Sequence, residues 1–318
     1  MTLPCPKAHL PPLSSTRSFE KHLLRTGFCM RASFVTGRRF HNTQAQSAKR
    51  SSWTHPVYTQ SEVLSVQAAH RNAKDWPDKL ALGTVRLLRW CMDCVTGYHT
   101  SHKTNAEPTR LSTYQMTEEK WIKRFVFLES VAGVPGMVAA MLRHLKSLRR
   151  MRRDYGWIET LLEEAYNERM HLLTFLKLSK PGPSMHFMVL SAQCVFFTGF
   201  SIAYILSPRI CHRFVGYLEE EAVITYTKAI QELDNGNLPL WSNMQAPPMA
   251  VKYWQMPEGH RCMRSLLLHV RADEANHRDV NHTLGSLDQD RDPNPFSAKF
   301  RAKVEEARRP LPASVKAN

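Results

Sequence analysis

Two short stretches of the chain place a glutamate three residues before a histidine. One is Asn-Glu-Arg-Met-His, with Glu168 and His171, and the other is Asp-Glu-Ala-Asn-His, with Glu274 and His277. In a helix, this separation puts both side chains on one face. A carboxylate beside an imidazole can bind a metal ion, although a single such pair is also common on a solvated surface. The surrounding pattern has to distinguish between these two interpretations.

Both pairs lie on faces that are otherwise apolar. Leu267 and Val270 precede Glu274 at the spacing of a buried helical stripe. The first pair continues a stripe made of Leu161, Ala165, Leu172 and Phe175. The intervening arginines, Arg271 and Arg278, are expected to point away from the apolar face. Both Glu-x-x-His pairs are therefore predicted to face the core.

Two further helical segments each place a single acid on an apolar stripe. Glu129 lies one helical turn after Phe125. Among three consecutive acids, Glu219 is preferred because it lies one turn after Val215 and two turns before Tyr226. An unpaired carboxylate in a protein core costs several kcal/mol. Four buried acids and two histidines therefore require bound cations.

These acids and histidines match a dinuclear metal centre inside a four-helix bundle. Such a centre takes one glutamate from each of two helices and one Glu-x-x-His pair from each of the other two. The candidate ligands are, in chain order, Glu129, Glu168, His171, Glu219, Glu274 and His277. Carboxylate and imidazole ligands without thiolate favour iron or manganese, and the residues alone do not choose between them.

The rest of the chain supplies helices to hold these residues. Helical patterns are expected at residues 77–97, 117–151, 155–178, 184–206, 208–236 and 259–287. No convincing strand alternation, GxGxxG or P-loop is present. The predicted fold is all-α, a ferritin-like four-helix bundle with two additional helices. The di-iron domain is placed at 77–290, after an extended arm at 51–76 and before a polar tail at 291–318, and residues 235–258 are expected to form a long connection.

One of the additional helices raises the question of a membrane. Residues 187–206 carry no charge over a length that could span a bilayer. A single crossing would put Glu168 and Glu219 on opposite sides, so they could not share a metal centre. This helix is therefore expected to lie on or partly in one leaflet, or to pack against the bundle. The helix at 77–97, with leucines beside lysine and arginine, is predicted to be a second interfacial helix.

The N-terminal region differs from the rest in charge. The chain has 318 residues and a formal net charge of +15, and residues 1–61 contain one acid, Glu20, among many basic and hydroxyl residues. This composition is typical of a mitochondrial transit peptide, predicted at 1–50 and expected to be cleaved, although a basic tail is the alternative. Zinc-finger, KH and RRM signatures are absent, so no nucleic-acid partner is expected. Cys91 and Cys94 form one CxxC without a second pair, so no zinc site is predicted.

Four motifs of the chain closely resemble those of the alternative oxidases. They are FLES, NERMHL, LEEEAVITYT and RADEANHR, within a resemblance that covers about residues 77–296. The resemblance implies a mitochondrial, cyanide-insensitive, non-haem ubiquinol oxidase with two iron ions. Such an enzyme oxidises two ubiquinols, reduces O2 to two waters and pumps no protons. The six candidate ligands fall on the iron ligands of this family.

The resemblance also implies roles for other residues. Tyr226 matches a tyrosine that is essential in the family, although it could also be a core tyrosine with a satisfied hydroxyl. The implied quinol-binding group is Arg124, Thr225, Leu128, Ala222, Glu221, Arg89 and Asp93. Without the family, Arg124 could equally contact a lipid phosphate. Asn167, His212 and Asp273 are expected to orient the ligands by contacting them on the side away from the metal.

The family further implies a monotopic homodimer on the matrix side of the inner mitochondrial membrane, in contact with its lipid. A plastid-type plastoquinol oxidase shares the same ligands and is one alternative. A ferritin-like iron-storage protein is an alternative from another functional class. Ser130 stands where the family commonly has threonine, a conservative change. No match is found for the regulatory cysteine of plant members, so disulfide control is not expected.

Overall fold

A computed structural model describes residues 55–96, 116–297 and 300. The described residues form helices and no strand, with one isolated bridge between Gln245 and Cys262. The predicted all-α class is therefore confirmed. The predicted transit peptide at 1–50 and residues 298–299 and 301–318 of the predicted tail lie outside the described residues.

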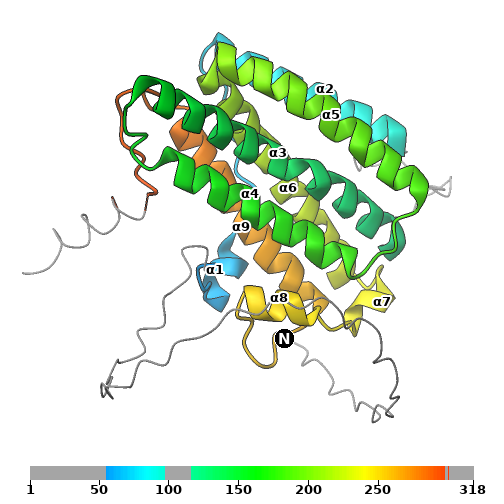
Figure 1. The fold of residues 1–318 in the computed structure, drawn as a ribbon. Coiled ribbons are helices and arrows are strands. Elements are labelled where there is room, and N and C mark those ends of the chain that lie inside the picture. Colours follow the sequence, from blue (N-terminus) through cyan, green and yellow to red (C-terminus); the bar gives the residue numbers. More distant parts are fainter. Residues whose placement is uncertain (1–54, 97–115, 298–299, 301–318) are drawn as a thin grey trace, which may run out of the picture. The chain divides into compact units, whose positions relative to one another are not determined.

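Four long helices make up the bundle. They are α3 (Glu118–Arg150), α4 (Trp157–Leu176), α6 (Pro208–Asp234) and α9 (Met263–Leu284). α3 packs along α4 and α6 packs along α9, and the two pairs meet through contacts of α3 with α6 and of α4 with α9 (Figure 1). Their ends fall within about four residues of the predicted ranges, because long apolar stripes define a helix well.

The ends of these helices follow local chemistry. Thr117 precedes α3, and its hydroxyl accepts a hydrogen bond from the Lys120 amide at 3.4 Å. Ser207 caps α6 in the same way, and Pro208 occupies the first turn, where its missing N–H is not needed. α3 ends where Met151 adopts a left-handed conformation, with φ of 49°.

α3 and α4 approach each other closely at Gly136. A Cβ atom at Gly136 would lie 2.7 Å from the backbone oxygen of Leu161, which is too close for any other residue without a shift of backbone. Gly136 and Leu161 lie two turns from Glu129 and Glu168, respectively. The glycine therefore sets the distance between two helices that carry candidate ligands.

Two outer helices cover one side of the bundle. α2 (Trp76–Thr96) packs against α6, and α5 (Pro183–Leu206) packs against α3. Only Phe200 and Tyr204 are buried among the 24 residues of α5. Its large exposed apolar side chains are Phe187, Leu190, Val195, Phe197, Ile202, Ile205 and Leu206. By length and composition α3 and α5 could each cross a membrane, but half of the apolar window of α3 is buried in the bundle.

Short helices occupy segments that were expected to be irregular. α1 (Gln60–Ser65) lies within the arm predicted as extended, and it starts with a capping box between Thr59 and Glu62. α7 (Pro239–Ser242) and α8 (Pro248–Tyr253) lie within the predicted connection at 235–258. Such segments span fewer than two turns, which is too short for an apolar period to show in the sequence. Figure 1 shows α1 and α8 on the opposite side of the bundle from α2 and α5.

Candidate metal centre

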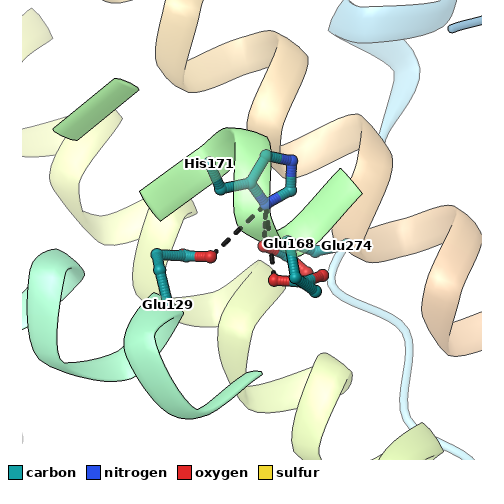
Figure 2. A group of neighbouring side chains, drawn as sticks. All are labelled: Glu129, Glu168, His171 and Glu274. Carbon is teal, nitrogen blue, oxygen red and sulfur yellow. Dashed lines mark ion pairs between the residues drawn. The ribbon is translucent and has the colours of Figure 1, made fainter. Parts of the chain in front are cut away.

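All six candidate ligands converge between the four bundle helices. Figure 2 shows Glu129 of α3, Glu168 and His171 of α4, and Glu274 of α9 pointing toward one another. Glu219 of α6 and His277 of α9 complete the cluster. Every one of these side chains is buried, as the apolar stripes predicted.

The six side chains form two overlapping groups. Glu129, Glu168, His171 and Glu274 offer ligand atoms that all lie within 4.8 Å of one another. Glu168, Glu219, Glu274 and His277 do the same. Each group contains one histidine and one glutamate of its own, and the groups share Glu168 and Glu274. The arrangement suits two adjacent cations bridged by two carboxylates.

Many of the atoms that face the centre of this cluster are buried without a hydrogen-bond partner. They are Oε2 of Glu129, both carboxylate oxygens of Glu168, Nδ1 of His171, Oε2 of Glu274 and Nδ1 of His277. Buried polar atoms in folded proteins are normally paired, so such a group needs an explanation. Cations bound between the oxygens and ring nitrogens provide one, and these residue types are ligands that iron accepts.

The pKa shifts within the cluster follow from the burial of several acids close together. Burial raises the pKa of Glu129 to about 8, and the charge of Glu274 adds to the shift. Burial, followed by the charge of Glu274, raises the pKa of Glu219 well above its usual value. Burial opposes charge on His277 too, yet the neighbouring carboxylate of Glu168 raises the pKa of His277 well above the usual value. Without cations, protons must therefore neutralise this cluster.

His171 is oriented by a partner on its far side. Its Nδ1 lies 3.3 Å from Glu274 Oε1 and 3.4 Å from Glu129 Oε2. Its Nε2 lies 3.0 Å from Oδ2 of Asp273, and Asn167 Nδ2 donates to the same oxygen at 3.0 Å. Asp273 and Asn167 thus lie where they were expected, next to a candidate ligand.

His212 lies further away than expected. Its ring is 3.1 Å from Tyr204 Oη and 3.1 Å from Asn281 Oδ1, rather than against one of the six side chains. Asn281 in turn donates to the backbone oxygen of His277 at 3.0 Å. Burial lowers the pKa of His212 to about 4, so a neutral ring occupies this position. His212 therefore reaches the cluster only through Asn281.

Three consecutive acids of α6 have three different surroundings. Glu219 joins the cluster, as its stripe predicted. Glu220 accepts from the Arg71 amide at 2.9 Å and lies 2.8 Å from His282 Nε2. Glu221 forms an ion pair with Arg89 of α2. The three side chains have different surroundings because successive residues of a helix point in different directions.

A further buried carboxylate beside the cluster, Glu164, was not identified from the sequence. It lies one turn before Glu168 on α4, and Asn281 Nδ2 donates to its Oε2 at 2.8 Å. Burial raises its pKa to about 7, against the charge of the nearby His277. The available signal was its position four residues before a candidate ligand, on the same helix face.

Tyr226 is directly connected to the cluster. Its hydroxyl donates a hydrogen bond to Oε1 of Glu129. Its ring stacks on Phe125, with centroids 4.7 Å apart, and also on Phe175. Burial and the charge of Glu129 raise the pKa of Tyr226 well above 10, so the phenol keeps its proton.

The charged members of the predicted quinol-binding set form ion pairs with one another where α2, α3 and α6 meet. Asp93 Oδ1 accepts from Arg124 Nη2 at 3.1 Å, and Asp93 Oδ2 lies 3.5 Å from Arg89 Nε. Arg89 also pairs with Glu221, whose backbone oxygen accepts from Thr225 Oγ1 at 2.8 Å. Leu128 of α3, one turn after Arg124, and Ala222 of α6 are partly exposed, as are Arg89, Asp93 and Glu221. Cys91 and Cys94, by contrast, are free thiols exposed on α2.

Comparison with known proteins identifies the family. A family model described as alternative oxidase matches residues 58–286. The chain is 65% identical over 251 residues to a protein of Aspergillus niger named "Alternative oxidase, mitochondrial", with 79% of this chain and 71% of that protein covered. It is 59% identical over 281 residues to a protein of the same name from Emericella nidulans, with 84% and 78% covered. The chain therefore belongs to the alternative oxidase family, and it is an oxidoreductase.

Proposed function

We propose that this chain is a ubiquinol oxidase that reduces O2 to water at two iron ions. The observation that carries the proposal is the pair of overlapping ligand groups that share Glu168 and Glu274. Glu129 and His171 complete one iron site, and Glu219 and His277 complete the other. When bound, two adjacent iron ions supply redox chemistry that no side chain of the cluster has.

The ubiquinol is expected to bind where α2, α3 and α6 meet. Arg124 and Thr225 offer hydrogen-bond donors for its oxygens, and Asp93 and Glu221 offer acceptors for its protons. Arg89 holds both acids in place, and Leu128 and Ala222 provide the apolar part of the contact. Two ubiquinols release four electrons and four protons, which balances the reduction of one O2 to two waters.

Tyr226 is proposed to act as a local source of one electron and one proton. When its phenol is oxidised, Oε1 of Glu129 is in hydrogen-bond contact to accept the phenolic proton. The aromatic rings of Phe125 and Phe175 keep water away from this hydrogen bond. Burial of Tyr226 and its hydrogen bond to Glu129 disfavour a free phenolate, so we propose that the proton leaves together with the electron.

The chain is proposed to be a monotopic protein of the mitochondrial inner membrane, on the matrix side, and a homodimer. The exposed apolar side chains of α5, and those of α2 at Leu80, Leu87 and Leu88, support insertion into one leaflet. The names of the two fungal relatives support the mitochondrial location. A chain that enters one leaflet offers no proton path across the bilayer, so the reaction pumps none. Turnover is expected to continue in the presence of cyanide.

Oxygen consumption by the purified, detergent-solubilised chain tests this function. With ubiquinol as donor, we expect turnover that persists in cyanide, two iron ions per chain and one O2 consumed for every two ubiquinols. Oxidation of plastoquinol in strong preference to ubiquinol would replace the proposed substrate. Failure to oxidise either quinol with iron bound would refute the oxidase function.

A further inference from the structure

A segment N-terminal to the bundle is fastened along α9 and α6. We call residues 55–75 the strap. Arg271 Nη2 donates to the backbone oxygen of Val63 at 3.1 Å, and Arg278 Nη1 donates to that of Gln67 at 3.1 Å. The first and last residues of the RADEANHR motif, Arg271 and Arg278, thus hold the strap. They lie on faces of α9 that point away from the cluster.

The strap also reaches the metal cluster through one carboxylate. Oδ1 of Asp273 lies 2.7 Å from His55 Nε2 and 2.7 Å from the hydroxyl of Tyr58. Its other oxygen, Oδ2, lies 3.0 Å from His171 Nε2 and accepts from Trp254 Nε1 at 2.8 Å. Asp273 therefore joins the strap on one side to a candidate iron ligand on the other.

We propose that His55 and Tyr58 are positioning residues for the metal centre. They hold the Asp273 carboxylate in one orientation, and Asp273 holds the His171 ring with Nδ1 toward the cluster. The inference rests on the proposed iron centre and assigns the strap a role in positioning one of its ligands. The proposed role is geometric. Among the described residues, Asp273 Oδ1 has hydrogen-bond partners only in His55 and Tyr58, whereas the donors from elsewhere in the bundle reach Oδ2.

The surroundings of Asp273 explain why the two donors matter. Its side chain is about 2% exposed, so water cannot replace a lost partner without a rearrangement. A buried charged oxygen without donors is strongly unfavourable, and the carboxylate is then expected to turn away from its present position. Partners of metal-bound histidines typically change metal affinity by about 10- to 100-fold when they are removed.

The two strap side chains are themselves held rigidly. The His55 ring makes an edge contact with Tyr58, with centroids 5.2 Å apart, and packs against Tyr253 at 4.9 Å. It also meets the edge of Trp254, whose ring stacks on His171. Aromatic packing thus supports the donors of the strap in this position, which is a requirement for a positioning role.

The test compares variants that differ in donors to Asp273. The double variant His55→Leu with Tyr58→Phe removes both donors and keeps most of the packed volume. The variant His55→Gln keeps an N–H donor near the position of Nε2. The control Arg278→Gln loosens the strap at Gln67 without touching Asp273. Each full-length protein is loaded with Fe(II), and the rate of iron release to a ferrous chelator is measured.

We expect the double variant to release iron about 10-fold faster or more, with His55→Gln and Arg278→Gln close to the original chain. In an Asp273→Asn background, the same double substitution should add little, because its effect passes through Asp273. Circular dichroism and melting of the metal-free proteins show whether the bundle is intact.

Unchanged iron release in the folded double variant would overturn the role of the strap and leave the proposed oxidase untouched. Equal acceleration by Arg278→Gln, or an undiminished effect in the Asp273→Asn background, would also overturn it, because the strap would then act by general stability. An original chain that binds no iron would instead refute the proposed centre itself.

Discussion

The phenol of Tyr226 on α6 donates its hydrogen bond to Oε1 of Glu129 on α3. Tyr226→Phe removes this donor but keeps the ring between Phe125 and Phe175, so iron binding should persist. Turnover should fall about 100-fold or more, the scale on which a positioned proton donor contributes. Oxygen uptake with ubiquinol, alongside iron analysis, measures both. Tyr155→Phe, at an exposed tyrosine, is the control, and normal turnover of Tyr226→Phe would remove this residue from the mechanism.

Glu274 belongs to both ligand groups, so its loss should affect both iron sites. Glu274→Ala is expected to abolish cyanide-resistant quinol oxidation and to lower bound iron below two per chain. Glu258→Ala, at an exposed acid before α9, should leave both measurements unchanged. Retained activity in Glu274→Ala would show that the ligand assignment is wrong.

Arg124 tests the proposed quinol site. Arg124→Gln removes the ion pair with Asp93, and we expect the KM for ubiquinol to rise about 10-fold, as for one lost charged hydrogen bond. Iron content should not change, because Arg124 is not a member of either ligand group. Lys123→Gln is the matched control, since Lys123 pairs with Glu119 on the exposed side of α3. An unaltered KM would place the quinol elsewhere.

Glu164 predicts a pH dependence of stability. Its pKa is about 7 in the folded chain, against 4.5 for an ordinary glutamate, so the folded state holds the proton more tightly. The folded state is therefore favoured below about pH 4.5, and this contribution is lost as the pH rises toward 7. Glu164→Gln should remove this dependence, which is on the order of 3 kcal/mol. Urea unfolding at pH 5 and pH 7.5 measures it, and an equal pH dependence in the variant would contradict the assignment.

Gly136 predicts a stability effect that depends on position. Gly136→Ala should destabilise the chain by about 1–3 kcal/mol, because the new methyl group meets the backbone of Leu161. Gly199→Ala, on α5 with open space around it, should stabilise by up to about 1 kcal/mol through helix propensity. Thermal melting compares the two variants. If both substitutions changed the melting temperature equally, close packing against α4 would not explain why position 136 is a glycine.

The long helices and the cluster could be predicted because each is a repeated local pattern. Glu129 and Glu219 stand out as acids on apolar stripes, and the two Glu-x-x-His pairs reinforce them. Glu164 lies four residues before Glu168 on the same face of α4, but it belongs to neither motif, so this spacing was the one signal that it would be buried. His212 was expected beside a ligand, and its actual partner, Asn281, depends on how α6 packs against α9.

The strap could not be predicted because its partners are remote in sequence. His55 meets Asp273 across 218 positions, and Val63 meets Arg271 across 208. Its one helix, α1, is too short to carry an apolar period, and its polar residues read as a solvated arm. Only the three-dimensional fold shows that His55 and Tyr58 lie against the buried Asp273.

The same long separations have a consequence for the order of assembly. The strap precedes α2 in the chain, but α9, its main partner, comes last among the helices of the described residues. Contacts between distant segments form late because the loop between them must first close. The strap therefore docks after α9 has joined the bundle. Until then, Asp273 lacks two of its donors and is not yet held in its final orientation beside His171.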